Sequence, residues 1–360
     1  ETLIGLNAAA QFSGIIVVAM IATTIIPKLG FYRVVMIGLG LVASMLLLLP
    51  MLRDYAIWFL LRFLLGIGNS LLFTAGDTWV NQIVEDRVRG RWIGIYSTVG
   101  MAGWAVGPLV GSNLSPESYA PFLVGVGAVS VAACLLWPTR KIDVSFGDEH
   151  RVRGGRNRLL LVFIAAPTVL LSSAMFGVVE GSLQSFAHLY TMDRLGAQYR
   201  EIGYAVIWVG SIAAIFFQYP IGWLADRFDR GWLLVACVSV MALAVGCFPL
   251  VINGALAPIG SWQWCLVWTV VAFWGGTMAG VFTVGITLLG ERFREVELIA
   301  ANAVFTLLFG LGGILGPFMV GTAMGHYGPQ GFTLSLVVVI SAYALFAAYR
   351  QATRSRRTAH

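Results

Sequence analysis

Three charged side chains lie within long apolar stretches of the sequence, where an isolated charge is costly. Arg62 and Asp77 fall in the stretch 56–84, and Glu180 falls in the stretch 159–190. Ionisable groups inside such stretches usually face an interior site and serve a function. A carboxylic acid among apolar neighbours can bind and release a proton near neutral pH. Glu180 is therefore predicted as the leading proton carrier and Asp77 as the second, while Arg62 is expected to orient partners or bind an anion.

Structural roles are the alternatives for these carboxylates. Glu180 can instead bond to neighbouring backbone or to Gln184, and Asp77 can hold the end of its helix through an ion pair or a hydrogen bond. Helical spacing favours a shared cavity, because each set of residues forms one stripe at 100° per residue. The first stripe is Arg62, Gly66, Asn69, Phe73 and Asp77; the second is Gly177, Glu180, Gly181, Gln184 and His188.

Other polar or aromatic side chains also project from apolar helices and are predicted to line the same cavity. Each of them, taken alone, fits packing or interfacial anchoring as well. They are Gln11, Tyr96, Trp104, Trp208, Ser211, Gln218, Thr277, Thr283, Asn302 and Thr306.

The composition indicates which elements must hold these residues. The chain has 360 residues, of which 58% are hydrophobic and only 11% are charged. Soluble domains are about one quarter charged, so this chain cannot cover its surface with polar groups. The sequence therefore predicts an all-α polytopic membrane protein. It has no phosphate-binding GxxxxGK[ST] loop, no CxxC or HxxxH metal pattern and no acid–base or nucleophile constellation, so we expect no ATPase, no metal, no cofactor and no enzymatic activity. The four cysteines are expected to be buried and inert.

A helix that crosses the bilayer needs roughly 20 apolar residues. Eleven stretches satisfy this requirement, and the polar segment 138–158 divides them into two groups. The stretches are 3–26, 31–52, 56–84, 92–113, 118–137, 159–190, 202–225, 232–252, 261–290, 296–325 and 331–349.

The basic residues predict the orientation, because cytoplasmic loops are enriched in lysine and arginine. Of 23 basic residues, 19 fall in one set of loops and in the C-terminal tail, whereas the opposite loops hold only Arg53, Arg194 and Arg200. The basic loops and the C-terminus are therefore expected in the cytoplasm. The 19 residues are Lys28, Arg33, Arg87, Arg89, Arg91, Arg140, Lys141, Arg151, Arg153, Arg156, Arg158, Arg227, Arg230, Arg292, Arg294, Arg350, Arg354, Arg356 and Arg357.

An internal repeat relates the two groups of stretches. Residues 27–33 and 226–230 occupy matching places about 199 positions apart, and Gly103, Gly107 and Pro108 recur 209 positions later as Gly312, Gly316 and Pro317. Repeats about a central loop are typical of secondary transporters. In the second half two stretches precede Asp226, whereas in the first half only one precedes Lys28. We therefore expect a natural first helix of roughly 20–30 residues to be missing from this numbering.

Three motifs in the expected order resemble those of the major facilitator superfamily, and the resemblance covers essentially the whole chain. Residues 222–230, GWLADRFDR, resemble the family's GxxxD(R/K)xG(R/K) loop, and residues 62–68 resemble RxxxGxG of the fourth helix. Residues 94–112 resemble the antiporter motif of the fifth helix and depart from it at the last glycine. The overall pattern resembles bacterial YcaD-type transporters and drug exporters.

The resemblance implies a cytoplasmic gate formed by Asp226, Arg227 and Arg230 with Lys28 and Arg33. Asp226 at a helix end can meet arginines or the N-terminus of a neighbouring helix when the cytoplasmic side closes. The first-half loop has Pro27 where the family usually has aspartate, which puts that half of the gate in doubt. Simple topology is the alternative for these charges.

The glycines of the antiporter motif predict close helix packing with a kink. Gly103, Gly107 and Gly111 recur at every fourth position, which lets two helices approach closely, and Pro108 can bend its helix. Gly316 and Pro317 are expected to act likewise in the second half. The family associates this pattern with exporters that exchange substrate for protons.

The resemblance implies two six-helix bundles related by a pseudo-two-fold axis. The expected parts are an N-terminal bundle 1–137 with family helices 2–6, a linker 138–158, a C-terminal bundle 159–352 with helices 7–12 and a basic tail 353–360. The predicted function is export of a small organic compound by proton antiport through alternating access, in a bacterial inner membrane. Proton-coupled uptake of a sugar, amino acid or organic acid is the alternative, and a lipid flippase or a sensor is a second one. The partners are the substrate, protons and the lipid bilayer, without nucleic acid, and the protein is expected to be monomeric.

Overall fold

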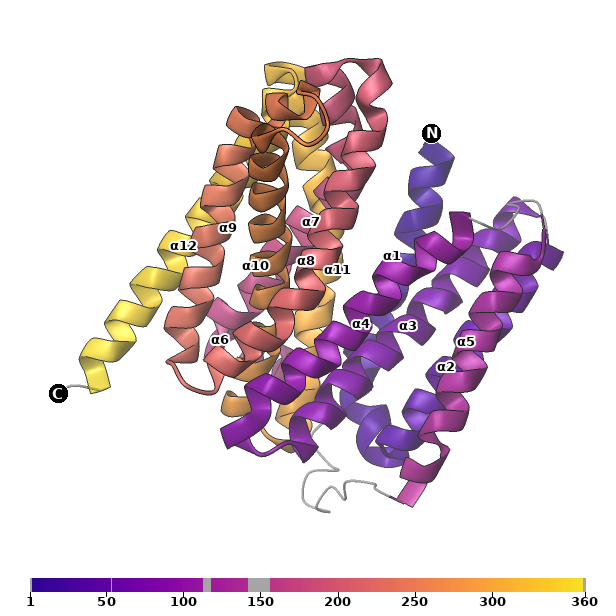
Figure 1. Ribbon diagram of the computed structural model, residues 1–360. Helices are drawn as coiled ribbons and strands as arrows, with labels where there is room; N and C mark the ends of the chain where they lie inside the picture. The colour runs from indigo at the N-terminus through magenta and orange to yellow at the C-terminus, as the bar shows by residue number, and fades with distance from the viewer. Residues whose placement is uncertain (1, 53, 113–117, 142–155, 359–360) are drawn as a thin grey trace. The chain divides into compact units, whose positions relative to one another are not determined.

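The computed structural model describes residues 2–52, 54–112, 118–141 and 156–358, and they form helices joined by short connections (Figure 1). They divide into two compact units. Unit 1 comprises Glu1–Ile83, Gly107–Ala166 and Leu289–Gly310, and unit 2 comprises Val84–Val106, Pro167–Leu288 and Leu311–His360. Three helices, α4 (Arg89–Ser112), α10 (Trp262–Arg292) and α11 (Glu295–Tyr327), contribute residues to both units. The sequence repeat instead predicts two bundles separated by the linker 138–158, and this division stays a prediction.

Unit 1 is built from α1 (Thr2–Leu29), α2 (Phe31–Met51), α3 (Tyr55–Ile83), α5 (Ala120–Leu136) and the short α6 (Arg156–Ala165). Helix α3 packs on both α1 and α2, and α5 packs on α2 (Figure 1). Gly30 separates α1 from α2 at a φ of 79°, a left-handed conformation that glycine adopts without strain. Asp54 precedes α3 and accepts a hydrogen bond from the backbone of Ile57 at 3.0 Å, which satisfies one free N–H at the helix start.

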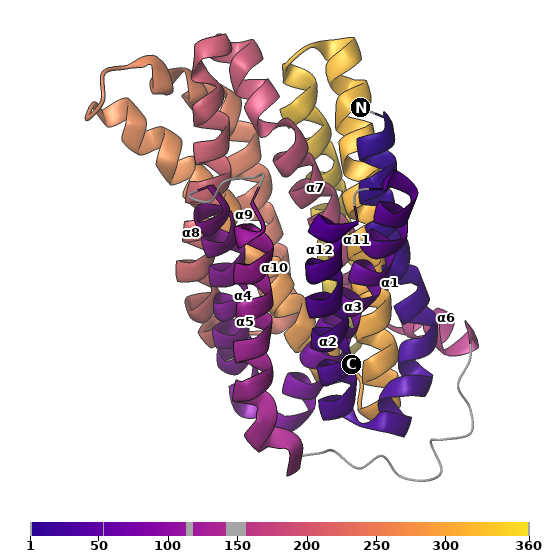
Figure 2. The same cartoon turned by 90° about the vertical axis from the view of Figure 1, so that its right-hand side faces the viewer.

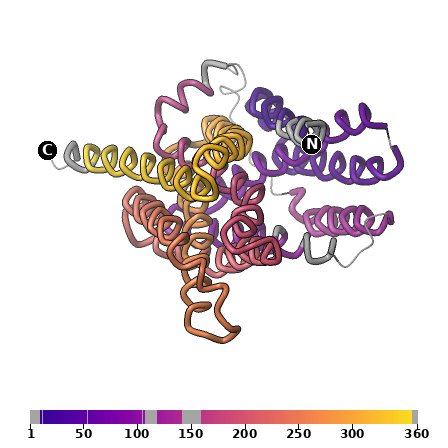
Figure 3. The backbone as a smooth tube through the Cα atoms, turned by 90° about the horizontal axis from the view of Figure 1, so that it is seen from above, coloured from indigo at the N-terminus to yellow at the C-terminus, as the bar shows by residue number. Residues whose placement is uncertain are grey.

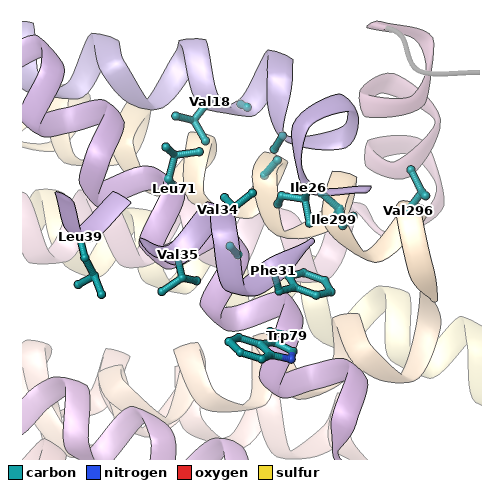
Figure 4. Close-up of a cluster of buried hydrophobic side chains, with 14 residues drawn as sticks. Val18, Ile26, Phe31, Val34, Val35, Leu39, Leu71, Trp79, Val296 and Ile299 are labelled. Atoms are coloured by element: carbon teal, nitrogen blue, oxygen red, sulfur yellow. The ribbon is translucent and has the colours of Figure 1, made fainter. Parts of the chain in front are cut away.

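The core of unit 1 is a buried apolar cluster that joins α1, α2 and α3 to the start of α11 (Figure 4). Phe31 stacks on Trp79 with ring centroids 6.1 Å apart, and Ile26, Val296 and Ile299 belong to the same cluster. Residues far apart in the sequence therefore meet at the ends of these helices.

Unit 2 is built from α7 (Pro167–Leu195), α8 (Arg200–Ala225), α9 (Arg230–Val251) and α12 (Gln330–Thr358), with parts of α4, α10 and α11. Helix α12 packs on α9 and on α7, where the Tyr343 hydroxyl donates to the Thr168 carbonyl at 2.8 Å. The orange connection between α9 and α10 projects from the unit (Figure 2), and Ile259 within it is 95% exposed. The yellow C-terminal part of α12 extends away from the other helices of unit 2 (Figure 3).

Nine helical segments among the described residues are long and apolar enough to cross a membrane, and a shorter apolar segment spans Ser13–Leu29. The protein is thus a multi-pass membrane protein. The count of eleven spans and the missing first helix stay predictions. The nine segments are Phe31–Met51, Tyr55–Ile83, Ala120–Lys141, Pro167–Leu195, Ala197–Ala225, Arg230–Leu256, Trp262–Arg292, Glu295–Tyr327 and Gln330–Arg354.

Three expectations differ from the structure. The stretch 159–190 is two helices rather than one, because Pro167 has no N–H to continue α6 and disfavours a helical residue before it. Helix α12 continues to Thr358 and so includes most of the predicted tail 353–360. Of the four cysteines expected to be buried, only Cys237 is; the other three lie on exposed helix faces, which an apolar bilayer would cover.

Candidate functional site

Asp226 holds the first turn of α4 to the last turn of α8 within unit 2. Its carboxylate accepts hydrogen bonds from the backbone N–H of Gly90 at 2.7 Å and of Arg91 at 3.1 Å. The Nε of Arg91 donates to the same carboxylate at 3.0 Å, and the Asp226 side chain is only 4% exposed. The first N–H groups of a helix have no partner within the helix and carry partial positive charge, so a buried carboxylate is a favourable partner for them.

A second set of polar contacts surrounds this one. Arg230 donates from Nη1 to Asp86 Oδ1 at 3.1 Å and from Nη2 to the Asp86 carbonyl at 2.9 Å. Its Nε donates to the Ala225 carbonyl at 3.0 Å. Arg89, which is 1% exposed, pairs with the same Asp86 carboxylate and donates to the Val84 carbonyl. Asp86 thus joins the first residue of α9, Arg230, to the first residue of α4, Arg89.

Glycines allow the two helices to approach closely enough for these contacts. A Cβ at Gly90 would collide with the Gly222 carbonyl oxygen, and one at Gly222 would collide with the Gly90 carbonyl oxygen. One turn further along α4, a Cβ at Gly94 would lie 2.7 Å from the carbonyl oxygen of Gln218. Backbone contact at these positions requires residues without side chains.

The predicted gate residues are found in different surroundings. Asp226 and Arg230 lie in the polar network, whereas Arg227 lies over the Trp223 ring, with Cζ 3.8 Å from the ring centroid. Lys28 and Arg33 are exposed at the α1–α2 connection of unit 1.

Sequence reasoning missed four residues of this network: Asp86, Arg89, Gly90 and Arg91. We interpreted the arginines at 87–91 only as orientation signals. One sequence feature could have predicted this network: the acidic residue Asp86 lies next to a run of arginines. A carboxylate in that position can pair with them.

In unit 1, the structure brings together two of the predicted lining residues. Arg62 of α3 donates from Nη1 to the Gln11 side-chain oxygen of α1 at 2.7 Å. One turn later a Cβ at Gly66 would collide with the Gln11 carbonyl oxygen, so α1 and α3 are in backbone contact here. The contact fixes Arg62 beside α1.

The predicted stripe on α3 does not share one environment. Asp77 is 2% exposed, Asn69 is half-buried and Phe73 is 45% exposed. Helix α3 packs on two neighbours, since Gly66 meets Gln11 of α1 whereas Gly68 meets Val42 of α2. The buried polar residues Ser70 and Thr74 precede Asp77 along the helix instead.

In unit 2, Glu180 accepts a hydrogen bond from the Gln184 side-chain amide one turn later on α7, at 2.6 Å. Glu180 is half-buried and Gln184 is exposed. At Gly181 a Cβ would lie 2.6 Å from the carbonyl oxygen of Gly313, which places α7 against α11. A cavity shared by Arg62 of unit 1 and Glu180 of unit 2 stays a prediction.

Most of the other predicted lining groups bond within their own helix. Ser211 donates to the Ile207 carbonyl at 2.9 Å, and Asn302 donates to the Leu298 carbonyl at 3.1 Å. Thr277 donates to the Phe273 carbonyl in the same way. Gln218 is different, because it is buried in α8 and accepts a hydrogen bond from Thr283 of α10.

The remaining predicted lining residues differ in burial. Tyr96 and Trp208 are half-buried, and Thr306 is buried in α11. The side chain of Trp104 lies outside the described residues.

The packing glycines behave differently in the two halves. A Cβ at Gly316 would collide with the Val178 carbonyl oxygen of α7, next to Pro317 in the interior of α11. At Gly103 it would meet no atom of the described residues within 4 Å, so the close packing expected there stays a prediction. The surroundings of Gly107, Pro108 and Gly111 lie outside the described residues. No group of three or more His, Cys, Asp or Glu side chains in the described ranges could hold a metal ion.

Comparison with known proteins identifies the family. The family model of the Major Facilitator Superfamily matches residues 1–214 and again residues 169–360. The chain is 26% identical over 327 residues to the uncharacterized MFS-type transporter YfkF of Bacillus subtilis, covering 89% of this chain and 79% of that protein. It is 24% identical over 347 residues to the uncharacterized MFS-type transporter YcaD of Escherichia coli, covering 95% of this chain and 84% of that protein.

Solved structures share the fold at low sequence identity. A variant of the Escherichia coli fucose:proton symporter FucP superposes with a TM-score of 0.75 at 15% identity, covering 97% of this chain and 91% of that chain. The human organic anion transporter MFSD10 superposes with a TM-score of 0.74 at 15% identity, covering 95% and 83%. Because the family model matches both halves of the sequence, the chain belongs to the Major Facilitator Superfamily.

Proposed function

We propose that the protein is a proton-coupled secondary transporter that works by alternating access and exports a small organic compound by proton antiport. In this proposal the protein is located in the bacterial inner membrane, and its basic loops lie in the cytoplasm. The observation that carries the proposal is the contact between Asp226 and the first turn of α4. Hydrogen bonds and ion pairs of this kind can break and re-form, because water replaces them at small net cost.

In this proposal the Asp226 contact closes the cytoplasmic side. Residues 84–106 come from the first half of the repeat and residues 222–230 from the second, so the contact links the halves at their basic-loop ends. Opening that side requires α4 and α8 to separate, which exposes the carboxylate and the N–H groups of Gly90 and Arg91 to water. The contact therefore sets part of the free-energy difference between the two states.

The proton carriers in this proposal are Glu180 of unit 2 and Asp77 of unit 1. Glu180 accepts a hydrogen bond from the Gln184 side-chain amide at 2.6 Å and lies within the apolar segment Pro167–Leu195, where an ionisable side chain usually serves a function. Arg62, fixed by Gln11, supplies a positive charge that would bind an acidic substrate group.

Proton-coupled uptake is the second candidate, because the similar structures include a fucose:proton symporter. Purified protein in proteoliposomes with an internal pH dye distinguishes the two directions of coupling. Candidate compounds added outside, beginning with fucose and organic anions, drive protons out under antiport and carry protons in under symport. A full panel that produces no proton movement contradicts both candidates.

Glu180→Gln tests the proposed carrier. We expect it to abolish substrate-linked proton movement while substrate-for-substrate exchange continues, because a neutral amide mimics the protonated acid. Glu201→Gln is the matched control, since Glu201 is exposed at the start of α8. Full proton coupling in Glu180→Gln would exclude Glu180 as the carrier, and Asp77→Asn would then be tested in the same assay.

A further inference from the structure

A hollow of about 350 Å³ lies beside the contact between α4 and α8 in unit 2. Its lining residues are Arg87, Arg91, Trp223, Asp226 and Arg227. Three arginines against one aspartate give the lining a formal charge of +2. The transport cycle proposed above uses Asp226 and the gate prediction includes Arg227, yet neither assigns a task to Arg87 or Trp223.

The single negative charge of the hollow is already engaged. Asp226 accepts hydrogen bonds from two backbone N–H groups and from Nε of Arg91, and its side chain is 4% exposed. The Arg91 side chain is 40% exposed, and the Nε bond to Asp226 orients its guanidinium beside the hollow. The hollow therefore presents positive charge toward an entering ligand.

Arg227 is held in a geometry that favours an anion. Its guanidinium lies over the Trp223 ring, with Cζ 3.8 Å from the ring centroid. Stacking uses the flat face of the guanidinium, while its N–H donors point outward in the plane. The ring thus restrains the side chain without consuming its hydrogen bonds, which reduces the entropy lost when a ligand binds.

We propose that this hollow binds a phosphate group. Planar arginine forks match phosphate oxygens in pairs, and a phosphate offers enough acceptors for Arg87, Arg91 and Arg227 together. The volume of about 350 Å³ accommodates a phosphate with part of the molecule to which it is esterified.

The position of the hollow favours the headgroup of an anionic phospholipid as the source of the phosphate. The lining residues lie at helix ends beside basic loops, the level at which headgroup phosphates meet the protein surface. Trp223 supplies the amphipathic ring that is typical of this interface. A soluble phosphate ester is the other source of the same chemistry.

Binding is expected to act on the gate. Arg87 and Arg91 come from the α4 side, whereas Trp223, Asp226 and Arg227 come from the α8 side, so the hollow is complete only while the two helices are together. A ligand that binds only one state stabilises that state in proportion to its occupancy. This consequence rests on the proposed gate, whereas phosphate binding itself does not.

The test is lipid binding to the purified full chain in uncharged detergent, measured by native mass spectrometry. We expect short-chain phosphatidylglycerol to bind more tightly than phosphatidylcholine. The double variant Arg87→Gln, Arg227→Gln is expected to weaken phosphatidylglycerol binding about tenfold or more, since it removes two charge-assisted contacts. Arg140→Gln is the matched control, because Arg140 also lies over a tryptophan, Trp137, at 4.5 Å and belongs to another basic loop.

Arg227→Lys is a conservative variant that distinguishes the effect of the positive charge from the effect of the planar guanidinium. It retains the positive charge but loses the planar fork, so we expect a loss smaller than that of Arg227→Gln. If soluble glycerol phosphate competes with phosphatidylglycerol, a free phosphate ester is a ligand of the same site. If glycerol phosphate does not compete, the lipid headgroup is the ligand. Equal binding of the two lipids, or equal binding by the wild type and the double variant, would overturn the proposal.

A spin-label distance between Glu85→Cys and Phe228→Cys measures the effect on the gate in the same samples. Both positions are exposed, on the α4 side and the α8 side. Phosphatidylglycerol is expected to increase the fraction of molecules in which the two spin labels are close together. Binding without a distance change would remove the coupling to the gate and leave the phosphate site intact. No substrate or pH gradient is present, so failure of the transport proposal would be seen separately.

Discussion

The two units join helices of the first and second halves of the repeat through contacts of opposite chemical character. In unit 2, the carboxylate of Asp226 bonds to the N-terminus of α4 at Gly90. In unit 1, the repeat places Pro27 at the position that corresponds to Asp226. The position that corresponds to Gly90, 209 residues later in the chain, is Ile299. Ile299 is fully buried in the apolar cluster that includes Ile26 and Phe31.

The two halves of the repeat therefore make their contacts with different kinds of side chain. The first-half loop has no aspartate, and the helix that it approaches presents Val296 and Ile299 near its start rather than glycine N–H groups. Burial of apolar side chains replaces the hydrogen bonds and ion pairs. One contact should therefore respond to charge and salt, and the other to side-chain volume.

The largest effect is expected from Asp226→Asn. This change removes the negative charge that accepts hydrogen bonds from Arg91 and from the N-terminus of α4. We expect it to weaken the free energy of the contact between α4 and α8 by about 2–4 kcal/mol. Spin labels at positions 85 and 228, in a variant without the native cysteines, should show a longer distance. Asp229→Asn is the control, because Asp229 accepts from Trp232 N–H of α9 and from Gln351 but takes no part in the α4 contact. An unchanged distance would mean that Asp226 does not hold the helices together.

Ile299→Ala tests the apolar contact of unit 1. Truncation of a fully buried isoleucine is expected to cost about 2–3 kcal/mol through lost burial and a cavity. Spin labels at the exposed positions Lys28 and Glu297 report on that contact. Ile314→Ala on the same helix is the control, since Ile314 is 41% exposed and should have little effect. Equal effects of the two substitutions would contradict the assignment of the contact to buried volume.

Gly90→Ala and Gly103→Ala compare two glycines of α4. At Gly90 the added methyl group collides with the Gly222 carbonyl, so we expect a cost of about 1–3 kcal/mol and a longer distance between positions 85 and 228. At Gly103 no atom of the described residues lies within 4 Å of the added methyl group, so alanine should be neutral or stabilise the helix by up to about 1 kcal/mol. Thermal unfolding together with the label distance checks both, and a destabilising Gly103→Ala would reveal a contact at that position in another state.

The smallest effect is expected from salt. Raising the ionic strength screens exposed charges such as Arg91, so the unit 2 contact should weaken by a few tenths to about 1 kcal/mol. The unit 1 contact should not weaken, because salt strengthens rather than screens apolar burial. Both pairs of labels can be followed in one salt titration, and parallel weakening would show that the two contacts are not chemically different.

Local patterns predicted much of the fold. The stretch expected at 31–52 is α2 from Phe31 to Met51, because Gly30 ends one helix and the apolar run defines the next. The family followed from motifs such as residues 222–230. The break at Pro167 was missed because a long apolar run hid a proline that permits a helix to start but not to continue there.

The candidate site was predicted less completely. Asp226 was expected to meet a helix N-terminus or arginines, and it meets both within unit 2. Phe73 shares the spacing of Arg62 and Asp77 but is exposed, because spacing predicts a face without telling which neighbour covers it. The roles of Glu180 and Asp77 in proton coupling stay predictions.

The sequence by itself determined that the chain is helical, apolar and a member of its family, because periodicity, hydropathy and short motifs are local properties. Only the tertiary structure decided which charges pair. Arg91 and Arg230 bond to Asp226 and Asp86, while Arg227 stacks on Trp223. Gly90 and Asp226 are separated by 136 positions in the chain, and their contact depends on how closely two glycine-bearing helices pack. No local pattern specifies that approach, because it results from the packing of whole helices.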